Sequence, residues 1–400
     1  MSTMTRVRSW RGAAILSYGF RPFFLFAALH AMFAILLWVP WFLGLVTLPS
    51  LLPPVAWHAH SLLFGYAPAV IAGFLLTAVP NWTGRLPVVG WPLAGLFSLW
   101  LAGRIATLVS SHLGAWLTAI VDLSFLCTLT AVVGREIVSA RNWRNLKILL
   151  VLWVLLVAQA LFHWEVDRSG RPEVADRLAI GAIVTLIALI GGRIVPSFTT
   201  NWIKRLNPGQ LPQPHSTLDN MVMAVGIVAL AAWIASAHIA VSGRLCGGLL
   251  TLAGLMHLGR QARWAPFRTL REPLVMILHV GYLFTGLGFV LTGLAELSHG
   301  RIAVSAGIHA WTTGAIGTMT LAVMTRAILG HTGQPLTANP TTLAIYAGIV
   351  IAAALRIVSA LAPQLTLVLM PFAGLAWIAA FLGFALAYGP VLVAPRAGSA

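Results

Sequence analysis

Histidine is the residue type with which this sequence can do the most chemistry, because the chain holds 12 histidines and only 9 aspartates and glutamates. Two of them, His58 and His60, lie two residues apart and open the apolar run PPVAWHAHSLLFGYAPAVIAGFLLTAVPNW. A neutral imidazole binds transition metals well, and in an apolar environment its ring nitrogens need partners. The residue types and their setting therefore predict sites where histidines bind a metal.

The elements that must position these histidines are membrane helices. Of the 400 residues, 59% are hydrophobic and 8% are charged, and the mean hydropathy is +0.90, far above that of soluble domains. An apolar segment of about 20 residues crosses the hydrocarbon core of a bilayer. The sequence predicts twelve such spans, at 23–47, 57–79, 91–110, 113–133, 147–163, 178–195, 218–239, 244–258, 273–296, 303–329, 341–361 and 367–390. The span 244–258 is the least well defined of them.

We therefore predict an all-α, polytopic protein with one integral membrane domain over residues 1–400. It would consist of a cytoplasmic segment 1–22, a helical bundle 23–390 and a cytoplasmic tail 391–400. With the N-terminus inside, 18 of the 25 basic residues fall at the cytoplasmic face, as the positive-inside rule requires of an even number of spans. The net charge of +16 then reflects topology and contact with anionic lipid, and it argues against a nucleic-acid-binding function.

Other cofactor and energy-coupling motifs are missing from the sequence. Cys127 and Cys246 lie far apart in apolar spans without a CxxC spacing, which speaks against disulfide frameworks and iron–sulfur sites. There is no Walker loop and no GxGxxG motif, so nucleotide hydrolysis is not indicated.

Depth along the predicted spans divides the histidines into two layers. The layer near the outer face contains His58, His60, His163, His238 and His309. The layer toward the cytoplasm contains His30, His257, His279 and His331. His112, His215 and His299 lie in loops, where solvation or an ordinary hydrogen bond explains them.

Small residues accompany two of the outer histidines. Three glycines share a stripe on the helix that follows His309, and two glycines share a face of the helix that follows His60: Gly307, Gly314 and Gly317, and Gly65 and Gly73. Such stripes also serve plain helix packing. One inward imidazole and a small face on each of two helices are, however, what a haem bound between them requires.

The remaining outer histidines suggest a copper site. On an ideal helix His58 and His60 point about 200° apart, so they share a centre only if the segment is unwound. In the simpler arrangement His60 binds haem, and His58 binds copper with His163 and His238. Nearer the cytoplasm, a second set could hold another cofactor or could form only hydrogen bonds to neighbouring helices: His30, His279 and His331.

Three charged residues lie within the predicted spans. Arg104 and Asp122 are at similar depth on either side of a short loop, and we expect them to form an ion pair. Arg356 has no acid at its depth on the adjacent predicted helices. It could bind haem propionates or reach for the membrane interface, and the sequence leaves both interpretations open.

Five segments spread over nearly the whole chain carry a family resemblance: SYGFRPFFL, AWHAHSLLFGYAPAVIAGFLLTAVPNWTG, GGRIVPSFTTNW, LHVGY and HAWTTGAIGTMTLAVMTRAILGHTG. Together they resemble the NnrS family, membrane proteins of the bacterial nitric oxide response that carry haem and copper. In the family pattern Glu-Met follows the second histidine of WHAH, whereas Ser61 and Leu62 stand here. A proton-handling role of that glutamate is therefore not expected in this chain.

The resemblance implies haem b and copper as cofactors and nitric oxide or another diatomic molecule as the ligand. It also implies a place in the bacterial inner membrane, with both termini in the cytoplasm by the charge count, and a role in nitric oxide metabolism or in defence against nitrosative stress. Whether the protein has an oxidoreductase-like activity on nitric oxide or acts as a sensor or a protective sink stays open. No segment of the sequence indicates an electron donor.

A remoter resemblance links the WHAH helix to the catalytic subunits of haem–copper oxidases and nitric oxide reductases. Those subunits have twelve helices in three arcs of four, and histidines of helices 2 and 10 hold their low-spin haem. The resemblance implies His60 and His309 as haem ligands, with Arg356 nearby. The oxidase pair of histidines on helix 10 is missing here, which argues against an oxidase-type binuclear centre. Weakly similar ends of helices 2, 6 and 10 also suggest a threefold repeat of four helices.

A secondary transporter of a small solute without a metal cofactor is the alternative. Buried histidines and arginines in broken helices would then line a substrate path. Such a protein is expected to show inverted repeats and an acid at the midplane, and only Asp122 meets the second condition. A Soret band in the visible spectrum of the purified protein distinguishes the two interpretations.

Overall fold

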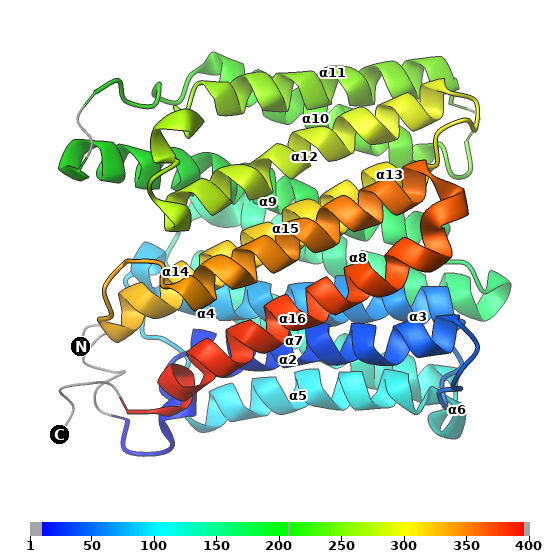
Figure 1. The fold of residues 1–400 in the computed structure, drawn as a ribbon. Coiled ribbons are helices and arrows are strands. Elements are labelled where there is room, and N and C mark those ends of the chain that lie inside the picture. The colour runs from blue at the N-terminus through cyan, green and yellow to red at the C-terminus, as the bar shows by residue number, and fades with distance from the viewer. Residues whose placement is uncertain (1–9, 207–208, 240, 396–400) are drawn as a thin grey trace. The chain divides into compact units, whose positions relative to one another are not determined.

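The computed structural model describes residues 10–206, 209–239 and 241–395, and these residues form helices without any strand (Figure 1). Nine helical segments in this part are long and apolar enough to cross a membrane. The prediction of an all-α, polytopic membrane protein is thus confirmed. The predicted spans 91–110, 244–258 and 303–329 are not among the nine, but each coincides with a continuous helical segment.

The helices follow one another with short connections. In chain order they are η1 (Ala14–Leu16), α2 (Phe20–Phe42), α3 (Pro54–His60), η2 (Ser61–Tyr66), α4 (Ala67–Thr83), α5 (Trp91–Leu108), α6 (Ser110–Leu113), α7 (Ala115–Ser139), η3 (Trp143–Asn145), α8 (Leu146–Ser169), α9 (Glu173–Leu206), α10 (Thr217–Ala235), α11 (Gly243–Ala262), η4 (Pro266–Thr269), α12 (Pro273–Leu297), α13 (Val304–His309), η5 (Ala310–Gly317), α14 (Thr318–Thr332), α15 (Pro340–Leu361), η6 (Pro363–Leu365) and α16 (Thr366–Val393).

Local sequence explains many of the helix ends. Proline is the first residue of α3, α12 and α15, where its missing N–H costs no hydrogen bond. Asn339 caps α15 by accepting a hydrogen bond from the backbone N–H of Thr342 at 2.8 Å. Gly84 and Gly170 end α4 and α8 with φ of 69° and 70°, a left-handed conformation that glycine adopts without a steric penalty.

Parts of the predicted terminal segments lie outside the described residues. These parts are 1–9 and 396–400, with Arg6, Arg8 and Arg396. The cytoplasmic location of the two termini therefore stays a prediction.

The chain packs as two compact units, and each is described by itself. Unit 1 comprises Met1–Ala179, Ile328–Gln334 and Phe384–Ala400, and unit 2 comprises Ile180–Ala327 and Pro335–Gly383. The single membrane domain and the three arcs of four helices, both expected from the sequence, stay predictions.

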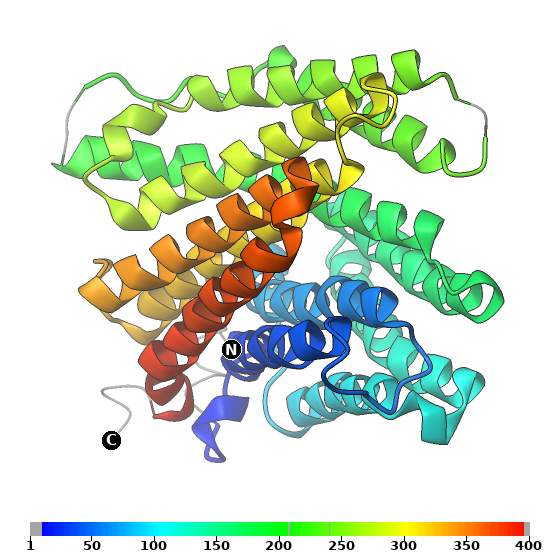
Figure 2. The same ribbon diagram turned by 45° about the vertical axis from the view of Figure 1, so that its right-hand side comes forward.

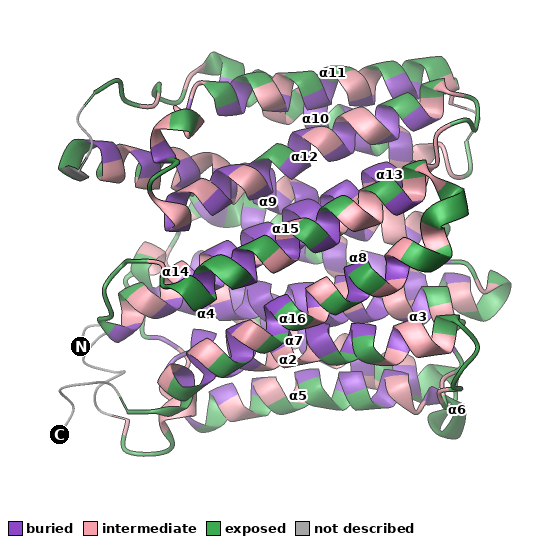
Figure 3. Cartoon of the chain, viewed as in Figure 1, coloured by how far each residue is buried: buried purple, intermediate pink, exposed green. Residues whose placement is uncertain are grey.

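In unit 1 the helix of the WHAH motif is the most deeply buried element. Figure 3 shows α4 mostly in the colour of buried residues, and both α2 and α7 pack against it. Gly73 allows the close approach of α2, since a Cβ there would lie 2.6 Å from a ring carbon of Phe24. The remaining neighbours α5 and α8 pack against α7.

Two of the long helices contain a π-helical segment, and each segment follows a predicted ligand directly. In unit 1, η2 begins one residue after His60, and in unit 2, η5 begins one residue after His309. A π-helix has i→i+5 hydrogen bonds, is rare, and frequently occurs at functional sites. The sequence analysis did not predict either segment.

In unit 2, α10, α11 and α12 run side by side in both ribbon views (Figure 1, Figure 2). Glycines let the backbones of α11 and α12 touch. A Cβ at Gly254 would lie 2.8 Å from the carbonyl oxygen of Gly286, and a Cβ at Gly247 would lie 2.7 Å from that of Gly293. The two glycines on each helix are seven residues apart, so they form one stripe. The glycines also lower the hydropathy of 244–258, which helps to explain why this predicted span is the least well defined.

This stripe predicts a position-dependent response to substitution. Gly254→Leu should destabilise the protein by roughly 1–3 kcal/mol, because the new side chain collides with the backbone of α12. Gly248→Leu is the matched control on the same helix, since a Cβ there meets no atom within 4 Å. Thermal denaturation in detergent measures both, and equal midpoints for the two variants would show that the glycine contact does not limit packing.

Candidate metal centre

A buried carboxylate lies at the centre of unit 1. Asp122 is fully buried, and its Oδ2 accepts hydrogen bonds from Nε2 of His60 and Nε2 of His163, both at 2.8 Å. The amide of Gln159 donates to the same oxygen at 2.8 Å. The other oxygen, Oδ1, forms an ion pair with the guanidinium of Arg104. One carboxylate therefore holds two imidazoles, an amide and a cation.

These side chains come from four helices. His60 ends α3, Arg104 lies on α5 and Asp122 lies on α7. Gln159 and His163 are four residues apart on α8, a spacing that places both on one face of a helix. The centre thus depends on the packing of α5 and α8 against α7.

The π-helix η2 shapes the space beside His60. Two carbonyls in it accept hydrogen bonds from side chains of other helices: Ser61 O from Nε2 of His30, and Gly65 O from Nε1 of Trp100, both at 2.9 Å. A Cβ at Gly65 would lie 2.6 Å from Nη1 of Arg104 and 2.5 Å from Nε2 of His30. Glycine at this position is therefore what lets Arg104 reach Asp122.

The geometry is compatible with a metal ion. Ligand atoms of His60, Asp122 and His163 all lie within 4.8 Å of one another. Two imidazole nitrogens and one carboxylate oxygen suit Cu, Zn or Fe, and Gln159 and Arg104 would orient the carboxylate. Several buried polar atoms here have no hydrogen-bond partner among the described residues, namely His60 Nδ1, Arg104 Nε, Arg104 Nη1 and Gln159 Oε1. Buried polar atoms of this kind are usually paired with a ligand, an ion or a water molecule.

A second interpretation of the same cluster is structural. An isolated charge in a membrane interior is costly, and Arg104 and Asp122 neutralise each other. The histidines and Gln159 then satisfy the remaining lone pairs of the carboxylate. The two interpretations differ in whether the imidazoles also bind a metal.

A comparison with models of known protein families identifies the family of this chain. A family model described as NnrS protein matches residues 14–396, nearly the whole chain. The chain belongs to the NnrS family. Membership supports a membrane protein of the nitric oxide response, with metal or haem involvement in general. A comparison with curated proteins gives no match.

In this NnrS protein the histidines of the WHAH motif have separate environments. The ring of His58 stacks on Trp38, with ring centroids 4.0 Å apart and 23° between the planes. The sequence analysis assigned His60 as a haem ligand, and it assigned His163, together with His58 and His238, as copper ligands. The structure instead brings His60 and His163 to one carboxylate. His58 and His60 diverge because residues two apart on a regular helix point in different directions.

His30 also differs from its prediction. It was expected in the cytoplasmic layer with His279 and His331, but its Nε2 contacts the carbonyl of Ser61, next to His60. Residue 30 lies midway along α2, so its side chain reaches the middle of the unit and not the end. The ring of His331 packs against the rings of Tyr18 and Phe20, with a distance of 5.5 Å between ring centroids in each pair.

In unit 2, His309 is held in one tautomer. Its Nδ1 lies 2.6 Å from the carbonyl oxygen of Ser305, so this nitrogen carries the proton and donates. Its Nε2 accepts from Nη2 of Arg356 at 2.7 Å. An imidazole whose Nδ1–H is bound to a carbonyl presents Nε2 as its acceptor, which is the nitrogen that a metal would bind in place of the Arg356 N–H. Arg356 was expected to meet a propionate or the interface, and here it contacts this imidazole.

The other predicted histidines of unit 2 have ordinary surroundings. Nε2 of His279 lies 2.9 Å from the hydroxyl of Thr199, the hydrogen bond to a neighbouring helix that the sequence left open. His238 is exposed in the turn after α10. Gln159, by contrast, was missed, although its position four residues before His163 was a signal that could have found it.

The Arg104–Asp122 pair generates a stability prediction. Asp122→Asn should destabilise this NnrS protein by roughly 3–5 kcal/mol, because Arg104 is left as an uncompensated buried charge. The double variant Asp122→Asn/Arg104→Met should recover part of that loss. Thermal denaturation in detergent measures the effect.

The matched control is the pair of Arg85 with Glu136, where the Arg85 side chain is 44% exposed and Arg135 is a second partner of Glu136. Arg85→Gln should change stability by no more than about 1 kcal/mol. If the double variant loses as much as the two single variants together, the buried charges do not stabilise each other.

Proposed function

We propose that this protein acts in nitric oxide metabolism or in defence against nitrosative stress, in the inner membrane of a bacterium. His60, Asp122 and His163 would bind a transition metal ion there, with copper expected. The observation that carries the proposal is the convergence of two imidazole nitrogens and one carboxylate oxygen within 4.8 Å in an apolar interior. Family membership supplies the link to nitric oxide.

Copper fits this donor set better than a hard cation does. Imidazole is a preferred ligand of copper, and divalent copper binds such sites most tightly among the first-row metals. Because Arg104 already balances Asp122, a monovalent copper ion would add only one net charge to the buried cluster. Bound copper would supply one-electron chemistry and a position at which nitric oxide can bind.

The protein's own side chains would position the ligands and keep water out. Arg104 and Gln159 hold the carboxylate from two sides. The rings of Phe64 and Phe162 pack against His60, with centroids 5.3 and 4.8 Å away. The two aromatic rings leave the imidazole few alternative orientations.

His309 is the residue we propose for haem b. Ser305 fixes its tautomer, and Arg356 places a cation where a propionate could bind. The haem would supply an iron that binds nitric oxide or another diatomic molecule. The sequence named His60 as the second haem ligand, whereas its contact with Asp122 makes it a copper ligand in this proposal.

The copper proposal predicts a selective loss of metal. His163→Ala should lower the copper-to-protein ratio of the purified protein at least about tenfold, because one of three donors is removed. His112→Ala, exposed on α6, is the control and should leave the ratio unchanged. Elemental analysis measures both. Equal copper-to-protein ratios in His163→Ala and the control would show that the cluster has only a structural role.

The haem proposal predicts an optical change. His309→Ala should remove the haem absorption spectrum, because His309 is the one protein ligand that this proposal gives the iron, while the copper content should persist. His299→Ala, in an exposed turn, is the control. An unchanged spectrum of His309→Ala would exclude it as the ligand. A wild-type protein with neither Soret band nor copper would favour the transporter.

A further inference from the structure

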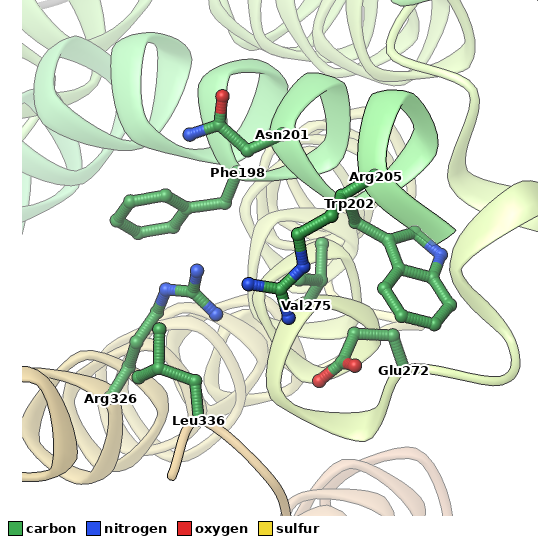
Figure 4. Close-up of a pocket in the computed structure, with 8 residues that line it drawn as sticks. All are labelled: Phe198, Asn201, Trp202, Arg205, Glu272, Val275, Arg326 and Leu336. Atoms are coloured by element: carbon green, nitrogen blue, oxygen red, sulfur yellow. The ribbon is translucent and has the colours of Figure 1, made fainter. Parts of the chain in front are cut away.

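A pocket at one end of unit 2 is separate from the residues used above. Its volume is about 200 Å³, and its lining residues are Phe198, Asn201, Trp202, Arg205, Glu272, Val275, Arg326 and Leu336. Figure 4 shows the guanidinium groups of Arg205 and Arg326 facing the same space, with the Glu272 carboxylate at its side. The pocket therefore combines two cations, one acid and an apolar wall.

Two of the segments that carry the family resemblance meet here. The last turns of α9, in GGRIVPSFTTNW, supply Phe198, Asn201 and Trp202. Arg326 comes from α14, in the segment that begins at His309. Neither segment end is explained by a role in the metal centre or in binding haem.

The protein neutralises the positive charge of the two arginines in this pocket only in part. The Arg326 guanidinium lies 4.0 Å from the ring centroid of Phe198, which holds it over an aromatic face. Among the described residues, neither arginine forms a close ion pair with Glu272. Burial raises the pKa of Glu272, although the nearby Arg326 and Arg205 oppose the rise. The pocket keeps a net positive charge even when Glu272 is ionised.

Two converging guanidinium groups favour a ligand that carries a phosphate group. Each presents a planar fork of N–H donors that matches the oxygens of a phosphate group. Side chains of Phe198, Trp202 and Val275 add apolar surface beside the charges. The pocket lies where α9 ends in Lys204 and Arg205, at the basic helix ends that the sequence assigns to the cytoplasm, where anionic lipid is abundant.

We propose that this pocket binds a phosphate group, carried by the headgroup of an anionic phospholipid. Arg205 and Arg326 bind the phosphate oxygens, and the apolar wall contacts the glycerol and the first carbons of the acyl chains. Glu272 repels the anion and so limits the affinity. Free phosphate is the other source of the same chemistry.

Lipid binding by the full-length protein in neutral detergent tests the proposal. Native mass spectrometry gives the affinity for short-chain phosphatidylglycerol, with short-chain phosphatidylcholine and inorganic phosphate as comparison ligands. Arg326→Gln should weaken phosphatidylglycerol binding roughly tenfold, because charge-assisted hydrogen bonds are lost. Glu272→Gln should strengthen it several-fold, because the repulsion is removed.

Arg271→Gln is the matched control, since Arg271 is exposed, adjoins Glu272 and does not line the pocket. Arg205→Gln provides a second loss variant at an exposed position, in case Arg326→Gln does not fold. Affinity that is unchanged in both loss variants, or equal for phosphatidylglycerol and phosphatidylcholine, overturns the proposal. If inorganic phosphate competes with phosphatidylglycerol at similar affinity, the pocket is a phosphate site whose ligand is the free anion and not a lipid. The copper content of every variant should equal that of the wild type.

Discussion

A carboxylate inside an apolar protein has to be neutralised and hydrogen-bonded, and unit 1 is organised around that requirement. Asp122 gathers donors from α3, α5 and α8, so three helices are tied to α7 through one side chain. Side chains of the neighbouring helices supply these donors, and each helix is thereby fixed in rotation as well as in position. The same requirement brings two imidazoles within reach of one metal ion.

The glycine stripes solve a related problem of distance. Between α11 and α12 they bring two backbones into contact, and the single glycine Gly65 leaves room for a guanidinium to pass a helix. In a membrane, packing of this kind replaces the hydrophobic driving force that holds soluble helices together. At Gly65 a small residue makes the space in which Arg104 meets Asp122.

Much of this architecture could be predicted from the sequence, because hydropathy and charge act locally along the chain. Predicted spans coincide with the long helices, including the glycine-rich 244–258. The contact of Arg104 with Asp122 followed from their depth. The grouping of histidines did not follow, since it depends on helix rotation: a regular helix turns about 100° per residue, and a π-helical segment changes that phase. Depth alone therefore placed His60 and His163 in one layer but could not show that both face Asp122, and it misplaced His30.

The π-helical segments have a consequence for how such a protein can arise. A π-helical turn accommodates an added residue within an α-helix while the flanking turns stay helical. Deleting one residue from η2 would restore an ordinary helix with the flanking turns in phase, and only the side chains within the segment would change direction. A scaffold of plain membrane helices could thus acquire a polar centre by a single insertion, without rebuilding its packing elsewhere.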